Sequence, residues 1–110
     1  MKNGRYEVVI HHHARDTYCE AFMPVGRYAK GENLIKSGTS FAYGQTMELD
    51  LQPGPYTLRM YDCDGHELVK QAVDIQGPTD VVVYSDHPPA GKREGWDRVE
   101  LHSAVKDGSL

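Results

Sequence analysis

The fold of this chain is decided by residues 47–61, which read MELDLQPGPYTLRMY. Apolar and polar side chains alternate on both sides of the turn Pro53-Gly54-Pro55. A period of two is what a β-strand with one buried face requires, because successive side chains point to opposite faces of a sheet. Proline and glycine together force the chain to turn between the two runs. The stretch therefore predicts two neighbouring strands joined by a tight turn.

Short alternating runs and turns continue on both sides of this stretch. Asp64-Gly65 is a strong two-residue hairpin signal, because a type I′ turn needs positive φ at both central positions. Gln76-Gly77-Pro78 marks another turn. We expect seven strands, over residues 5–13, 17–23, 45–52, 56–61, 67–75, 79–84 and 96–102.

Length and composition agree with a single β domain. The chain has 110 residues, of which 39% are hydrophobic, enough for one core and too few residues for two. Seven of the ten aromatic residues are tyrosines, which suit half-buried strands. We therefore expect an all-β fold, an antiparallel β-sandwich of about seven strands that is immunoglobulin-like or transthyretin-like. Residues 1–85 form the sandwich, and residues 86–110 form a Pro/Gly linker and tail of the same domain that carries the last strand.

Residues 25–43 are the least regular part of the chain, and we expect a long loop with one short edge strand. A loop of this length in a compact domain is functional or contains a further element. Its aromatic residues suggest a partner-binding surface, because aromatic side chains on loops are common contact anchors. The alternative is that the rings cover the ends of the core. The residues concerned are Tyr28, Phe41 and Tyr43.

Charge argues against some partners. The formal net charge is −4, and acidic and basic residues are interspersed. Binding to nucleic acid requires a basic stripe, which is missing, so we expect no nucleic-acid partner. No stretch approaches the roughly 18 apolar residues of a membrane-spanning helix. No apolar segment follows the N-terminal residues, so we expect a secreted or periplasmic location if a leader was removed, and a cytoplasmic one otherwise.

The two cysteines, Cys19 and Cys63, leave two interpretations open. They can form one disulfide in an oxidising compartment, which would stabilise the fold by a few kcal/mol. They are equally consistent with two buried thiols. The chain contains no CxxC spacing, so a zinc knuckle or a thioredoxin-type site is not indicated.

Four segments between residues 17 and 75 carry a resemblance to a known group of proteins: YCEAFMP (18–24), ENL (32–34), LQPGPYTLR (51–59) and YDCDG (61–65). This part of the chain resembles bacterial secreted or lipoprotein β-sandwich domains without assigned activity. The PG turn, strand and DG hairpin are also similar to those of transthyretin-like and carboxypeptidase regulatory-type domains. The resemblance implies an export signal upstream and a Cys19–Cys63 bridge.

The run His11-His12-His13 is the most unusual local feature. On a strand, His11 and His13 project from the same face, close enough to share one metal ion such as zinc or copper with a third ligand. The alternative is a polar strand end whose imidazoles face solvent. Candidates for the third ligand are a carboxylate, His66, His87 or His102.

Two other groups have the composition of a known site without its spacing. Three acidic residues surround the expected hairpin and suggest calcium, but calcium requires six to eight oxygens, and turn chemistry accounts for these residues. They are Asp62, Asp64 and Glu67. Ser85-Asp86-His87 has the residues of a hydrolase triad, but adjacent side chains on an extended segment point to opposite faces. We expect neither a calcium site nor a catalytic site.

The sequence therefore predicts a non-enzymatic binding or structural module that acts through its loops or a sheet edge. We expect no cofactor, and either a protein partner or self-association. The alternative function is a metal-binding protein that uses the strand face of His11 and His13.

Overall fold

The computed structural model describes residues 4–25, 31–85 and 97–104. Within them the chain forms seven strands and no helix, which confirms the predicted all-β sandwich. Most strand ends lie within one or two residues of the predicted ones. The strands are β1 (Tyr6–His13), β2 (Tyr18–Phe22), β3 (Thr46–Leu51), β4 (Gly54–Asp62), β5 (Glu67–Ile75), β6 (Thr79–Ser85) and β7 (Asp97–Ser103).

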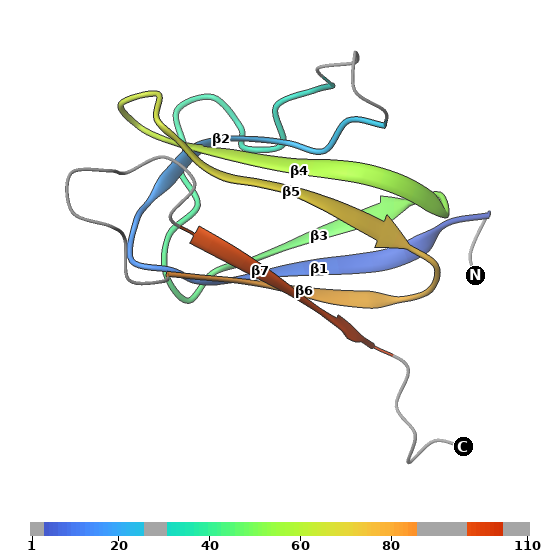
Figure 1. Ribbon diagram of the computed structural model, residues 1–110. Coiled ribbons are helices and arrows are strands. Elements are labelled where there is room, and N and C mark those ends of the chain that lie inside the picture. Colours follow the sequence, from blue (N-terminus) through green and yellow to red (C-terminus); the bar gives the residue numbers. More distant parts are fainter. Residues whose placement is uncertain (1–3, 26–30, 86–96, 105–110) are drawn as a thin grey trace.

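The strands form two layers that face each other (Figure 1). One sheet has four strands in the order β3-β1-β6-β7, and the other has three in the order β2-β4-β5. The pairing is antiparallel with one exception, since β1 and β6 run parallel. The predicted antiparallel sandwich therefore holds for every ladder except this one. Strands joined by a short turn must be antiparallel, but four other strands separate β1 from β6 in the chain, and no short turn fixes their relative direction.

The core lies between the two sheets and is filled by the inward face of each strand. In β1 the inward positions are Val8, Ile10 and His12, all fully buried. Burying each large aliphatic side chain contributes roughly 1.5–3 kcal/mol. In the neighbouring strand β6, Val81 and Val83 lie beside these β1 residues on the same face of the sheet. The opposite sheet supplies the facing residues, among them Tyr56, Leu58, Met60, Val73 and Ile75.

A bulge interrupts β2 at Cys19. Tyr18 pairs with Asp62 and Glu20 with Tyr61, so Cys19 has no partner of its own in the ladder. A bulge adds one residue to a strand and reverses the alternation beyond it. Strict alternation from the buried Tyr18 would bury Glu20, but the bulge exposes Glu20 and buries Ala21.

The loop from residue 31 to residue 45 covers the outer edge of β2. The Leu34 amide donates to the Ala21 carbonyl at 2.8 Å, and Phe41 exchanges two main-chain hydrogen bonds of 2.9 Å with Tyr18. The predicted short edge strand is not formed in this described loop. In its place are an isolated bridge at Phe41 and the side chain of Asn33, whose Oδ1 accepts from the Ala21 amide at 3.0 Å.

The remaining sheet edges differ in their surroundings. β5 and β7 lie against each other where the two sheets meet, and the Gln71 side chain donates to the Val99 carbonyl at 3.2 Å. β3 ends the four-stranded sheet on the opposite side. Within the part of the chain that the structure describes, no main-chain hydrogen bond reaches its outer edge.

Candidate functional site

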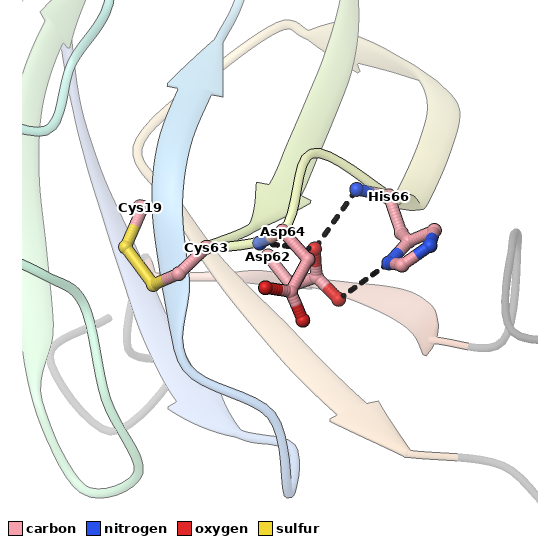
Figure 2. Close-up of polar contacts among 5 residues, drawn as sticks. All are labelled: Cys19, Asp62, Cys63, Asp64 and His66. Carbon is pink, nitrogen blue, oxygen red and sulfur yellow. Dashed lines mark hydrogen bonds and ion pairs between the residues drawn. A yellow bond between two sulfur atoms is a disulfide. The ribbon is translucent and has the colours of Figure 1, made fainter.

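The turn between β4 and β5 brings several ligand-type side chains together (Figure 2). The Asp62 amide donates to the His66 carbonyl at 2.9 Å, and the Gly65 amide donates to the Asp62 carbonyl at 3.1 Å. Gly65 has a φ of 87°, which favours glycine. The hairpin loop therefore consists of three residues, Cys63, Asp64 and Gly65, and ends with the glycine in the left-handed conformation. The predicted two-residue type I′ turn was wrong.

The carboxylate of Asp62 organises this turn. Its Oδ1 accepts hydrogen bonds from the amides of Asp64 at 3.0 Å and His66 at 2.8 Å, and its Oδ2 lies 3.2 Å from Nδ1 of His66. Burial acts to raise the pKa of Asp62, but the hydrogen bonds from His66 and Asp64 outweigh it and the net pKa is lowered. Asp62 is therefore ionised at neutral pH although only 7% of its side chain is exposed.

A disulfide between Cys19 and Cys63 fixes the same turn to β2 (Figure 2). Their Cα atoms are 4.9 Å apart, within the range that a disulfide requires. The bulge at Cys19 makes the contact possible, since it takes Cys19 out of the regular alternation of β2. Of the two interpretations that the sequence left open, the structure has the disulfide.

Three side chains at this turn form a donor cluster, defined here as Asp62, Asp64 and His66. Within the described ranges it is the one group of at least three histidine, cysteine or acidic residues whose ligand atoms all lie within 4.8 Å of one another. Glu67, which the sequence grouped with these acids, points elsewhere. Its Oε2 accepts from Arg59 Nε at 2.7 Å and from the Tyr61 hydroxyl at 3.0 Å.

His11 and His13 lie where the alternation predicted, on the outer face of the four-stranded sheet. Their ring centroids are 6.4 Å apart. His11 Nε2 lies 2.9 Å from Oδ1 of Asp80 on β6, while the ring of His13 lies 6.2 Å from that of Tyr43. The pair does not belong to a three-ligand group in the described residues, so metal binding there stays a prediction.

The histidines suggested as a third ligand for His11 and His13 are not grouped with that pair in the described residues. The structure groups His66 with Asp62 and Asp64. His102 lies on β7, with its Nε2 3.3 Å from Glu100. His87 lies outside the described residues.

His12, the buried member of the triple histidine, was not among the predicted core or site residues. The amide of Ala14 donates to its Nδ1 at 3.1 Å, so Nε2 must carry the hydrogen, which it donates to the Asp16 carbonyl at 2.7 Å. Its ring packs against Tyr18, with centroids 4.8 Å apart, and against Phe41 at 5.1 Å. Burial lowers the pKa of His12, so the imidazole is neutral. The signal was available, because His12 alternates in register with two core residues of the same strand.

A second buried polar group joins β2, β6 and β7. The Tyr18 hydroxyl donates to Asp97, and the Ser85 hydroxyl donates to the other oxygen of the same carboxylate at 3.2 Å. Burial raises the pKa of Asp97 in spite of these bonds, and burial also raises the pKa of Tyr18. Ser85 accepts from the Arg15 amide at 2.8 Å, so its contacts are those of a structural residue. The rest of the triad-like sequence, Asp86 and His87, lies outside the described residues.

The aromatic residues suggested as a partner-binding surface separate into three cases. Phe41 is 4% exposed and belongs to the core, so for this ring the structure favours the alternative that it covers an end of the core. Its main chain pairs with Tyr18, which directs the ring inward onto His12. Tyr43 is 72% exposed and remains a candidate contact residue. Tyr28 lies outside the described residues.

The outer edge of β3 receives no main-chain hydrogen bond from the described residues. Its inward side chains are half-buried and pack against the core, namely Met47, Leu49 and Leu51. Glu48 and Asp50 are exposed on the outer face, where Asp50 lies directly opposite Glu7 of β1. A groove of about 480 Å³ lies where β3 begins, lined by the loop residues Ile35 and Phe41 and by the first residues of the strand.

Comparison with known proteins adds no family to this description: no family model matches the chain, and neither a curated protein nor a solved structure shows significant similarity to it. The structure itself establishes an all-β sandwich of two sheets. Among the described residues there is no helix with the length and apolar character needed to cross a membrane.

Proposed function

We propose that this chain is a non-enzymatic binding module that accepts an extended segment of a partner protein along β3. The observation that supports the proposal is the outer edge of β3, which no main-chain hydrogen bond from the described residues reaches, beside the groove at its first residues. An exposed strand edge presents unpaired N–H and C=O groups, and addition of a strand satisfies them while pockets select alternate side chains. The half-buried apolar side chains of β3 would gain cover from the same event.

The charge on β3 favours a particular partner. Glu7, Glu48 and Asp50 share the outer face near the edge, and no ion pair within the described part of the chain involves them. Like charges directly opposite each other in a sheet are destabilising. A segment that alternates basic and apolar residues would relieve this repulsion and cover the edge. We therefore infer a basic, extended partner segment.

The same charges argue against pairing of two copies of this chain through β3. In an antiparallel pair of β3 strands centred on Leu49, Glu48 of each copy would lie opposite Asp50 of the other. Two such acidic pairs would oppose association. The partner is therefore a different protein.

The disulfide supports an oxidising compartment as the place of action, because disulfides persist in secreted and periplasmic proteins and are rare in the cytosol. With the resemblance to exported bacterial and transthyretin-like β-sandwich domains, it leads us to propose an exported module. No catalytic step is part of this proposal.

The proposal can be tested with two labelled eight-residue peptides, one that alternates lysine and valine and one that alternates glutamate and valine. We expect fluorescence anisotropy to show the lysine peptide binding at least about tenfold more tightly, since electrostatic complementarity sets the preference. Reversal of both β3 charges, in the variant Glu48→Lys/Asp50→Lys, should transfer the preference to the glutamate peptide.

Glu100→Lys is the control, because it reverses one acidic charge on β7 at the far side of the same sheet. It should leave both affinities unchanged. The proposal is overturned if neither peptide binds, or if the preference ignores the charges on β3. Concentration-dependent dimerisation that Glu48→Pro abolishes would replace the partner with a second copy, because the N–H of Glu48 faces the outer edge.

A further inference from the structure

We propose that the donor cluster at the β4–β5 turn binds a divalent transition-metal ion, with zinc as the reference case, through Asp62, Asp64 and His66. The inference is independent of the β3 edge. It rests on donors of two chemical types that converge at one point, two carboxylates and an imidazole, with all ligand atoms within 4.8 Å of one another (Figure 2).

The spacing of the two inner donors fits one shared ion. Oδ2 of Asp62 and Nδ1 of His66 are 3.2 Å apart. Two atoms that each lie about 2.0–2.1 Å from one zinc ion are separated by roughly 3–3.4 Å at tetrahedral or octahedral angles. An ion that replaces the hydrogen between these atoms therefore requires little movement of either side chain.

The rest of the turn holds these donors in place. Oδ1 of Asp62 is held by the amides of Asp64 and His66, which leaves Oδ2 of the same carboxylate directed at the imidazole. Hydrogen bonds of this kind orient a metal ligand. The Cys19–Cys63 disulfide ties the residue between Asp62 and Asp64 to β2. The ligands therefore lie on a turn that is held both by its own hydrogen bonds and by the disulfide to β2.

The identity of the donors selects the class of ion. Calcium and magnesium prefer oxygen ligands in sets of six or more, and an imidazole ligand favours zinc, copper or nickel. Three protein ligands leave at least one coordination position for water or a further donor. The two carboxylates give the cluster negative charge, which a divalent cation neutralises. The side chain of His66 is 46% exposed, so an ion can reach the cluster from solvent.

The test uses the full chain with its disulfide intact, freed of metal by a chelator that is then removed. Zinc chloride is titrated into it by calorimetry, and we expect one ion per chain. The variants His66→Gln and Asp64→Asn each remove one ligand at an exposed position and should each weaken the Kd at least about tenfold. Both substitutions leave Oδ1 of Asp62 with its two main-chain donors, and unchanged near-ultraviolet circular dichroism will confirm that the variants fold.

The matched control is the double variant His11→Gln/His13→Gln, which removes the other pair of neighbouring histidines. It should leave the Kd for zinc unchanged. In NMR spectra, zinc should shift the imidazole resonances of His66 before those of His11 and His13. The assignment is overturned if His66→Gln and Asp64→Asn leave the Kd for zinc unchanged, or if the His11→Gln/His13→Gln variant no longer binds zinc. It is also overturned if the wild-type chain does not bind zinc.

Discussion

Two edges of this sandwich, those of β2 and β3, are treated in opposite ways. The edge of β2 is covered by the loop from residue 31 to residue 45, which supplies main-chain partners and the side chain of Asn33. The edge of β3 receives no main-chain hydrogen bond from the described residues. Natural sheets cover, shorten or charge their edges to avoid aggregation. Here a loop covers the edge of β2. At the edge of β3, the described residues provide acidic side chains and no main-chain partner.

The contrast extends into the core beneath each edge. Under the β2 edge the contacts are specific, since the buried imidazole of His12 packs against Tyr18 and Phe41. Under the β3 edge the side chains are aliphatic and half-buried. The aromatic rings under β2 are already enclosed by their neighbours. The half-buried aliphatic side chains of β3 can still gain contact with a further apolar surface. The loop over β2 therefore adds buried contacts to the core, whereas β3 is the edge that we propose accepts a partner.

Loss of the main aromatic contact under the closed edge should have the largest effect. Phe41→Ala removes a buried ring and should lower the free energy of unfolding by about 3–5 kcal/mol, measured by urea denaturation. Tyr43→Ala, two residues along the same loop and 72% exposed, should change it by no more than about 0.5 kcal/mol. Equal effects of the two substitutions would show that the loop does not close the core.

The disulfide holds β2 to the β4–β5 turn and should contribute somewhat less. It joins cysteines 44 residues apart, and its loss in the variant Cys19→Ala/Cys63→Ala should lower the free energy of unfolding by about 2–4 kcal/mol. A reducing agent should destabilise the wild-type chain by a similar amount and leave the double variant unaffected. The bridge would be contradicted if the reducing agent did not change the unfolding of the wild-type protein and both of its thiols reacted freely.

The side chain that covers the closed edge should matter less again. Oδ1 of Asn33 accepts from the amides of Ala21 at 3.0 Å and Ile35 at 3.1 Å. Asn33→Ala leaves these donors without a partner, at a cost of about 1–3 kcal/mol. Hydrogen exchange of the Ala21 amide should accelerate. Glu32→Ala, an exposed neighbour, is the control, and an unchanged Ala21 exchange rate in Asn33→Ala would refute the role of Asn33.

The smallest effect is expected from pH, through the buried imidazole. Burial lowers the pKa of His12 below its ordinary value of 6.5, so the unfolded chain binds more protons at this site than the folded one. Its contribution is complete above pH 6.5 and is lost as the pH falls below that value. The neighbouring Asp16, Tyr18 and His13 are unchanged in the variant His12→Gln, which should show a weaker dependence of unfolding free energy on pH over this window. An identical dependence in both proteins would exclude His12 as the source.

Much of the fold could be predicted because the alternation along the chain is regular where strands are regular. Residues 47–61 predicted two strands and their turn, and both are present. The predicted faces of side chains are wrong where an extra residue in a strand shifts the alternation. A bulge such as that at Cys19 depends on pairing with a distant strand, and the partner Asp62 is far along the sequence. The parallel pairing of β1 with β6 depends in the same way on the whole topology.

The candidate sites were less predictable, because a side chain's role depends on what faces it. Asp62 and Asp64 were noticed, but His66 was assigned to another pair, since spacing alone cannot tell which donors a turn brings together. For Phe41 a contact surface and a cover for the core were both open, because its loop has no periodic pattern that would show which way the ring points. His12 could have been recognised by extending the alternation of its strand by one step.

Amide hydrogen exchange measured by NMR, with and without the lysine–valine peptide, tests most directly whether β3 is the binding edge. In the free protein the outward-facing amides of β3 should exchange rapidly, and those of Tyr18 and Ala21 should be protected by their partners Phe41 and Asn33. The peptide should slow exchange along β3 and leave β2 unchanged. Protection of β3 in the free protein, or a peptide that protects another edge or none, would contradict the account.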